Sequence, residues 1–229
     1  MQAGDLFNWP DSLALFREWF NPRTAAVSWV GKIAQALKVV AEEGKSHVPD
    51  VPSGLSLSGP VSIHPSVTLP PFGTIEGPTW IGPDCELRAG VYIRGNVIAG
   101  RGCVLGNSCE FKNSLLLDEA KIPHFSYVGD SVIGNRVNLG AGTILSNLRF
   151  DGRPVRATGP DGPIDTGTRK FGALIGDDAQ TGCHAVLQPG VILGRKAVVM
   201  GSIPFSGWLD HDHFAYAKPE IHTLRRKRD

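Results

Sequence analysis

Apolar residues recur at every sixth position over long stretches of this chain. They are Ile81, Leu87, Ile93, Ala99, Leu105, Phe111 and Leu117 in a first run, Ile133, Leu139 and Leu145 in a second, and Ile175, Leu187, Leu193 and Val199, with Thr181 among them, in a third. Neither a helix of period 3.6 nor a strand of period two produces this spacing. Short repeats of this kind are typical of a parallel β-helix, in which successive coils stack on one another. The sequence therefore predicts an all-β solenoid of hexapeptide repeats.

The repeats resemble those of hexapeptide-repeat families, in which three hexapeptides make one triangular coil. Residues eighteen apart should then lie one above the other at about 4.8 Å. Arg94 and Lys112 are eighteen apart, so we expect two cations on neighbouring coils of one face. Like charges at this spacing repel unless an anion lies between them. A phosphate is the candidate anion, because Arg and Lys are the usual phosphate ligands, and two solvated cations that splay apart are the alternative.

The composition suits a turn-rich solenoid, with 229 residues, 28 Gly, 17 Pro and a net charge of +1. There is no broad basic excess and no apolar run of the ~20 residues that a membrane helix needs, so we expect no nucleic-acid partner, no membrane partner and a cytoplasmic location. Cys85, Cys103 and Cys109 fall on the small-apolar position of their hexapeptides and should point into the solenoid, whereas Cys183 does not. No zinc-type ligand spacing is present, and we expect no metal site.

Four segments follow from the pattern: a helical extension over 1–47, a linker over 48–60, the β-helix over 61–205 with an inserted loop at 149–169, and a tail over 206–229. The extension should hold one helix over 11–20 and another from Thr24 to about Glu43, with Gly44 ending it. Such helices would cover an exposed edge or flank of the solenoid.

The hexapeptide pattern breaks twice, between Leu117 and Ile133 and between Leu145 and Ile175. Irregular segments held against a regular scaffold are where binding groups concentrate. The first break contains His124 and Tyr127, and the second contains the 149–169 loop. We therefore expect the functional residues at these two breaks.

Two long segments resemble one known family. NSCEFKNSLLLDEAKIPHFSYVGDSVIGNRVNLGAGTILSN, over 107–147, and RKFGALIGDDAQTGCHAVLQPGVILG, over 169–194, resemble the acetyltransferase domain of the bifunctional N-acetylglucosamine-1-phosphate uridyltransferase/glucosamine-1-phosphate acetyltransferase family. The motif H-x-S-Y-x-G-D followed by I-G-x-x-V-N-x-G-A-G-T is more specific than hexapeptides alone. The resemblance implies a left-handed β-helix, a homotrimer, acetyl-coenzyme A as co-substrate and a step of UDP-N-acetylglucosamine biosynthesis. No nucleotide-binding α/β segment precedes the repeats, so acetyl transfer without uridylyl transfer is expected.

Matched residue by residue, the resemblance implies sugar-phosphate contacts at Arg94, Lys112, Tyr127, Asn138 and Lys170. It implies that His124 is the general base, because the acceptor amine must lose a proton and imidazole titrates in the useful range. Glu110 matches a carboxylate that would orient this imidazole. The positions implied for the coenzyme are Ala141, Asn147, Cys183 and Gly201.

Three departures from the family leave alternatives open. Leu148 stands where the family has an aromatic residue beside the coenzyme, Cys183 replaces a small hydroxyl residue, and the 149–169 loop is longer. The alternatives are a non-catalytic module that binds a sugar phosphate or nucleotide sugar, and an N-acetyltransferase for a nucleotide-linked amino sugar. The Asp210–His213 cluster is expected to be solvated and not to bind a metal, and the basic run over 225–228 is expected to be a disordered tail.

Overall fold

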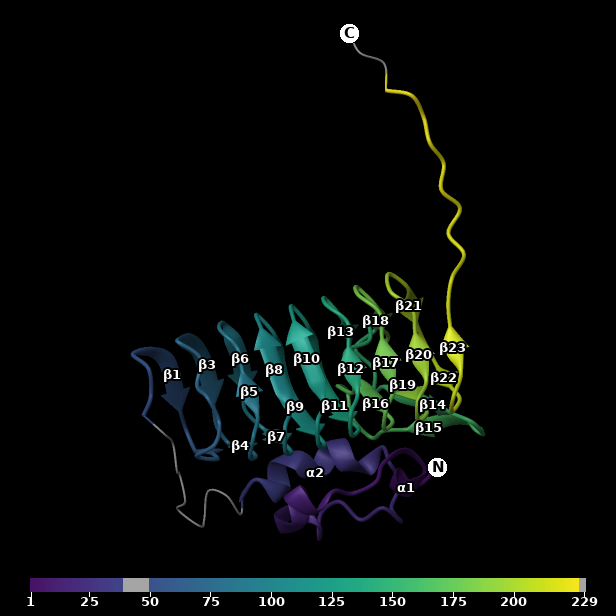
Figure 1. Ribbon diagram of the computed structural model, residues 1–229. Coiled ribbons are helices and arrows are strands. Elements are labelled where there is room, and N and C mark those ends of the chain that lie inside the picture. Colours follow the sequence, from purple (N-terminus) through teal and green to yellow (C-terminus); the bar gives the residue numbers. More distant parts are fainter. Residues whose placement is uncertain (39–49, 227–229) are drawn as a thin grey trace.

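A computed structural model describes residues 1–38 and 50–226, and it shows a parallel β-solenoid with a helical unit along one side (Figure 1). Successive coils stack through parallel strand pairs, as in the pairing of β6 with β9 and of β10 with β8. The predicted β-helix is thereby confirmed, and the arrangement agrees with the left-handed form that the resemblance implies.

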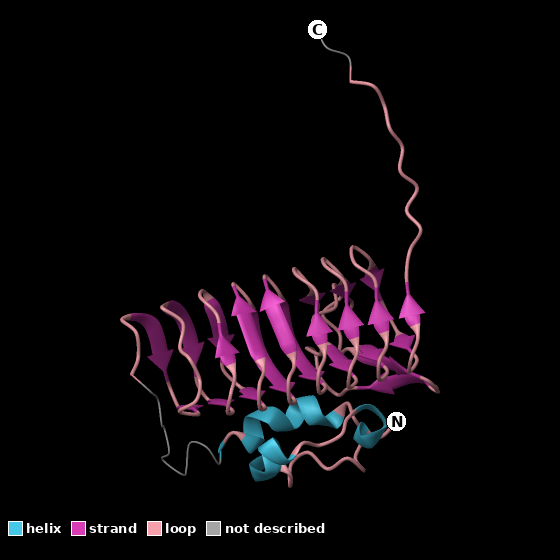
Figure 2. Ribbon diagram, in the orientation of Figure 1, coloured by secondary structure: helices cyan, strands magenta, loops and turns pink. Residues whose placement is uncertain are grey.

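Three faces form the solenoid, coloured magenta in Figure 2. The first face holds β1 (Gly54–Ser58), β3 (Phe72–Glu76), β6 (Val91–Arg94), β13 (Ile144–Leu145), β18 (Val186–Leu187) and β21 (Pro204–Phe205). The second face holds β2 (Val61–Ile63), β4 (Thr79–Ile81), β7 (Val97–Ala99), β16 (Ala173–Ile175), β19 (Val191–Leu193) and β22 (Trp208–Leu209). The third face holds β5 (Glu86–Leu87), β8 (Val104–Asn107), β10 (Lys121–His124), β12 (Asn138–Leu139), β17 (Gln180–Thr181), β20 (Val198–Val199) and β23 (Phe214–Ala215). Two long strands, β9 (Glu110–Leu116) and β11 (Tyr127–Ile133), run from the first face onto the second.

The repeated apolar residues fill the interior of the solenoid. Ile93, Leu105, Leu139 and Leu187 are fully buried in one continuous core. Cys85, Cys103 and Cys109 belong to the same core, as the hexapeptide pattern predicts. A row of small and branched apolar side chains therefore replaces the two-layer core of an ordinary globular domain.

Most corners of the solenoid contain a residue with positive φ. At the corner between the third and first faces these are Ser108 at 51°, Phe125 at 50° and His184 at 58°, on different coils. Side chains other than glycine rarely adopt this conformation, so the stacking of the coils holds the backbone there. The corner is thus a column of constrained residues that runs along the solenoid axis.

The coil length changes at the first break in the repeat. Lys121 pairs with Val104 on one side and Asn138 on the other, so two coils have 17 residues instead of eighteen. As a result Leu116 pairs with Ile133 and points into the solenoid, and the sequence-based assignment of Leu117 to the core ladder is corrected. Leu117 is buried instead on the outer side, in the cluster formed with the helical unit.

The helical unit covers the second face. It contains α1 (Ala3–Leu6), a 3₁₀ helix, η1 (Asp11–Phe16), and α2 (Ser28–Ala36), and buries Phe16, Phe20 and Trp29 against the outward side chains of that face. Strands of the second face are consequently buried on both sides, as in Val97–Ala99 and Ala173–Ile175.

Buried polar groups fix the helical unit in position. Asp177, only 1% exposed, accepts hydrogen bonds from the Asn8 amide at 2.9 Å and from the Asn135 side chain at 2.9 Å, while Asn135 donates to the Asn8 carbonyl at 2.7 Å. The chain before the solenoid is therefore docked through specific hydrogen bonds as well as aromatic packing.

The segment bounds differ from the sequence-based expectation. β1 lies in the expected linker, and β22 and β23 lie in the expected tail, because end coils pair with the solenoid without a regular hexapeptide repeat. The expected helix over 11–20 is the shorter 3₁₀ helix η1, and the second helix begins at Ser28 in α2 instead of at Thr24. The end of that helix near Gly44 lies outside the described residues, as does part of the basic run over 225–228.

The inserted loop forms a hairpin of β14 (Arg156–Gly159) and β15 (Gly162–Asp165). Val155, Ala157 and Phe171 are buried in the same cluster as the helical unit, so the loop packs beside it. Among residues 1–38 and 50–226, no helix has the length and apolar character needed to cross a membrane.

We predict opposite effects for two Gly→Ala substitutions. A Cβ on Gly106 would overlap the backbone of Pro123 on the next coil, so G106A should lower the free energy of unfolding by about 2 kcal/mol or more. Gly31 lies in α2, and a Cβ added there would meet no atom of the described residues within 4 Å. G31A should therefore raise the free energy of unfolding by about 0.5–1 kcal/mol. Urea unfolding measures both, and equal effects would contradict the tight coil stacking described above.

Candidate functional site

The two expected phosphate ligands lie on the outward side of the first face. The register that pairs Tyr92 with Glu110 and Ile93 with Phe111 brings Arg94 beside Lys112. Arg94 Nη1 donates to Glu110 Oε1 at 2.6 Å, and its guanidinium carbon lies 5.9 Å from the centre of the Tyr92 ring. Lys112 Nζ lies 3.2 Å from Asp130 Oδ2. Each cation thus has a carboxylate of this chain beside it, which relieves the repulsion expected from the sequence.

Asp130 is the centre of a buried polar network. Its carboxylate is 4% exposed and accepts hydrogen bonds from Lys112 Nζ, from Asn113 Nδ2 at 2.9 Å and from Asn147 Nδ2 at 2.6 Å. Asn147 also donates to the Tyr127 hydroxyl at 2.9 Å. The network holds Lys112 and Tyr127 in fixed positions at the corner between the first and second faces.

Tyr127 is kept protonated at neutral pH. Burial raises the pKa of its phenol, the nearby Asp130 charge raises it further, and the hydrogen bond from Asn147 lowers it in part. The hydroxyl accepts the Asn147 bond and retains its own proton. It can therefore donate a hydrogen bond to an anion bound beside Lys112.

His124 lies at the end of β10, at the corner where the third face meets the first. Its side chain is exposed, and its ring centre lies 6.1 Å from that of Phe125. Within residues 1–38 and 50–226, no side chain or backbone group is hydrogen-bonded to the imidazole. Glu110, the carboxylate expected to orient it, is paired with Arg94 instead.

Three of the four expected coenzyme residues form a column that begins beside His124. The His124 carbonyl accepts from the Gly142 amide, the Ala141 carbonyl from the His184 amide, and the Cys183 carbonyl from the Ser202 amide, at 2.7–3.0 Å. Ala141, Cys183 and Gly201 therefore follow one another along this corner. The fourth, Asn147, is away from the column, in the Asp130 network.

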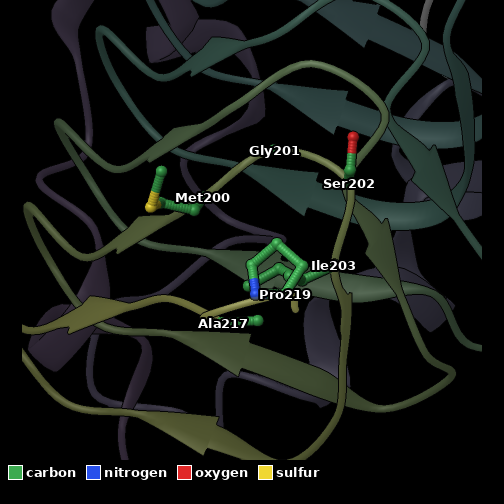
Figure 3. Close-up of a pocket in the computed structure, with 6 residues that line it drawn as sticks. All are labelled: Met200, Gly201, Ser202, Ile203, Ala217 and Pro219. Carbon is green, nitrogen blue, oxygen red and sulfur yellow. The ribbon is translucent and has the colours of Figure 1, made fainter. Parts of the chain in front are cut away.

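A cavity of about 240 Å³ opens at the far end of this column. Met200, Gly201, Ser202 and Ile203 line one side, and Ala217 and Pro219 of the C-terminal segment line the other (Figure 3). The lining is mainly apolar, and the Ser202 side chain is part of it.

Asn138 and Lys170 differ in their relation to the group of Arg94, Glu110, Lys112, Tyr127, Asp130 and Asn147, which we call the first-face cluster. Asn138 is exposed on the third face, paired with Lys121 and Gln180, so it lies around the corner from Arg94 and Lys112. Lys170 pairs with Leu148 across the base of the inserted loop, next to Asn147, and so lies beside the Asp130 network. One chain thus brings together Arg94, Lys112 and Tyr127, with the backbone of Lys170 nearby, but not Asn138.

Asp130 is the residue that the sequence interpretation missed. It ends the motif H-x-S-Y-x-G-D, so its position was visible, but its role depends on the contact with Asn147, seventeen residues away. The described residues contain no group of three or more His, Cys, Asp or Glu side chains arranged to hold a metal ion. In the Asp210–His213 segment, the His211 ring accepts a hydrogen bond from the Arg195 amide at 2.9 Å.

Comparison with known families gives one match. Residues 75–198, more than half of the chain, match the family described as GMPPB C-terminal domain. The chain belongs to this family. The matched region contains all residues of the first-face cluster and His124. It also contains Ala141 and Cys183 of the column, but not Gly201.

Several relatives of this GMPPB C-terminal domain chain are named as bifunctional proteins. It is 38% identical over 138 residues, 60% of its length, to the Bifunctional protein GlmU of Methanococcus maripaludis, covering 33% of that protein. It is 39% identical over 135 residues, 59% of its length, to the Bifunctional protein GlmU of Methanococcus vannielii, covering 32% of it. It is 39% identical over 141 residues to the Bifunctional sugar-1-phosphate nucleotidylyltransferase/acetyltransferase of Sulfurisphaera tokodaii, a match that spans 54% of this chain and 35% of that protein. The chain spans about a third of the length of these relatives.

We predict that Asp130 stabilises the site. In D130N the Lys112 charge loses its partner and the new amide group faces the donors of Asn113 and Asn147, so the free energy of unfolding should fall by about 2 kcal/mol. Asn tolerates the positive φ of 49° at this position, so the backbone is not the cause. The exposed pair partner Asp151 gives the control D151N, which should unfold like the wild type. Equal denaturation midpoints for D130N and the wild type would contradict this role.

Proposed function

We propose that this chain transfers an acetyl group from acetyl-coenzyme A to the amine of a sugar 1-phosphate similar to glucosamine 1-phosphate. The observation that carries the proposal is the position of His124 at one corner, with the column Ala141, Cys183 and Gly201 on one side and the first-face cluster on the other. The names of the relatives, which include acetyltransferase and sugar-1-phosphate, support the same reaction.

The acceptor would bind through its charge. Arg94, Lys112 and Lys170 supply cations for the phosphate, and the protonated Tyr127 hydroxyl supplies a neutral donor. Glu110, held beside Arg94, would attract the amine of the sugar before it loses its proton. Arg94 is paired with Glu110, and Lys112 is paired with Asp130, so the site holds both positive and negative groups. Such a site fits a substrate that carries both a positive amine and a negative phosphate.

The donor would bind along the column of Ala141, Cys183 and Gly201. Acetyl-coenzyme A supplies the acetyl group as a thioester. His124 takes the proton of the attacking amine, the nitrogen–carbon bond forms and the carbon–sulfur bond breaks. Its exposed imidazole, without a hydrogen-bond partner among the described residues, is free to accept that proton.

A homotrimer and a cytoplasmic location are part of the proposal. The helical unit occupies the second face, so neighbouring copies would pack on the first and third faces, which carry the two halves of the site. Packing of this kind would bring Asn138 of one copy toward the cluster of another. The four cysteines are all unpaired, which suits a reducing compartment.

The second candidate function is a module that binds a sugar phosphate without catalysis. Asn147 favours it, because its amide is used inside the Asp130 network and not exposed toward the coenzyme column. Leu148, which is 48% exposed and not aromatic, favours it as well. Binding of acetyl-coenzyme A, measured by calorimetry, separates the two functions.

The first test is the substitution His124→Ala. Turnover, measured as thiol release from acetyl-coenzyme A with glucosamine 1-phosphate, should fall by about a hundredfold or more, while affinity for the sugar phosphate is unchanged. The exposed His64, whose imidazole bonds to the nearby Ser66 side chain and amide, gives the control H64A with full turnover. Unchanged turnover in H124A would remove His124 from the reaction.

The second test concerns the phosphate. R94Q should raise KM for the sugar phosphate by about tenfold and leave kcat nearly unchanged, since it removes one charged hydrogen bond to the phosphate. Arg101 forms a similar exposed ion pair with Asp84 at another corner, and R101Q is the matched control. A lower kcat with the same KM would contradict the phosphate role of Arg94.

A further inference from the structure

A second cavity, of about 400 Å³, lies beside the first-face cluster. Its floor is Ser146, Gln188 and Pro189 of the first face, and its wall is the turn at 148–151 that opens the inserted loop. We call it the loop groove. Its volume is in the range of sites that hold small organic molecules.

The loop groove and the cluster are linked by the strand register and by Asn147. Lys112 pairs with Gly129, and the register of β11 on β13 carries this column on to Ser146, two strand spacings or about 9.6 Å from Lys112. Asn147, between the groove residues Ser146 and Leu148, donates to Tyr127 and Asp130. Lys170, paired with Leu148, lies at the boundary and adds a third cation.

The wall of the groove presents an aromatic face that no described part of the chain covers. Phe150 is fully exposed, and Leu148 is 48% exposed. A large apolar side chain gains nothing from full exposure in a folded chain, and an exposed aromatic ring above a cavity is suited to stack on a planar ligand. The hydroxyl of Ser146 and the amide of Gln188 provide hydrogen-bonding groups on the floor.

The turn that carries Phe150 is held in shape. Arg149 and Asp151 form a two-point ion pair at 2.9 and 2.6 Å, which holds the pKa of Asp151 well below its usual range. The Gly152 amide donates to the Arg149 carbonyl at 3.1 Å, and Arg169 donates to the Gly152 carbonyl at 3.0 Å. A wall that is ordered before binding loses less entropy when a ligand arrives.

We propose that the loop groove binds the base of a nucleoside diphosphate, and that the acceptor is a nucleotide-linked amino sugar. The base would stack on Phe150, and the diphosphate would extend along the first face to Lys170, Lys112 and Arg94. The sugar amine then reaches the corner at His124. This inference rests on the proposed function, because it names the class of acceptor for the same reaction.

The test begins with binding, which does not depend on turnover. Titration calorimetry with uridine and guanosine diphosphates should show affinity at least about tenfold higher than for inorganic pyrophosphate, the margin expected from stacking of one base. F150A should bind the nucleoside diphosphates no more tightly than pyrophosphate, and its affinity for pyrophosphate should equal that of the wild type. F72A removes another half-exposed Phe on the same face, at the opposite end, and should keep the margin. The absence of a margin in the wild type, or its persistence in F150A, overturns the inference.

Turnover then separates this inference from the proposed function. Acetyl transfer to UDP-glucosamine should be more efficient than transfer to glucosamine 1-phosphate, and F150A should lower kcat/KM about tenfold for the first acceptor only. Turnover on glucosamine 1-phosphate with no nucleotide binding overturns the inference and upholds the proposed function. Nucleotide binding through Phe150 with no acetyl transfer to either acceptor overturns the proposed function and supports the groove as a base site.

Discussion

The structure depends on one constraint, which is that the chain must turn a corner after every strand while its backbone hydrogen bonds to the coils above and below. Residues with positive φ at the corners meet this constraint, and they include Phe125, Asp130 and His184, which are costly in that conformation. Neighbouring coils hold them there through parallel strand pairs of fixed register. Because the corners are aligned, the corner side chains of successive coils lie about one strand spacing apart.

This alignment explains why the site is assembled at corners. His124 lies at one corner and Asp130, inside β11, lies at the next, with residues 127–129 between them on the first face, so a short motif in sequence spans a full face of the solenoid. The change to coils of 17 residues occurs in the same region and sets the side on which Leu116 and Leu117 are buried. A one-residue change in coil length therefore places Leu117 in the surface on which the helical unit packs.

The helical unit and the inserted loop complete the molecule by covering the second face together. Phe16 and Trp29 of the helical unit and Phe171 of the loop belong to one buried cluster. Packing the base of the loop in this way leaves its opening turn at 148–151 beside the first face, where it forms the wall of the loop groove. Residues of the insertion near its ends pack in the buried cluster, whereas its opening turn at 148–151 forms part of the loop groove.

The sequence alone determined the solenoid, because a hexapeptide period has no other regular explanation, and it determined the neighbouring positions of Arg94 and Lys112, because register follows from coil length. It also pointed to His124 as a candidate general base, through the resemblance carried by the motif H-x-S-Y-x-G-D, and this role stays a prediction. Only the tertiary structure decided which carboxylates neutralise the two cations, since Glu110 and Asp130 meet them across coils. The same holds for Asn147, which joins the Asp130 network instead of the column of Ala141, Cys183 and Gly201, and for the side of the solenoid that the helices cover. These contacts depend on side chains far apart in the chain meeting at particular corners, and a local repeat carries no information about which partners meet there.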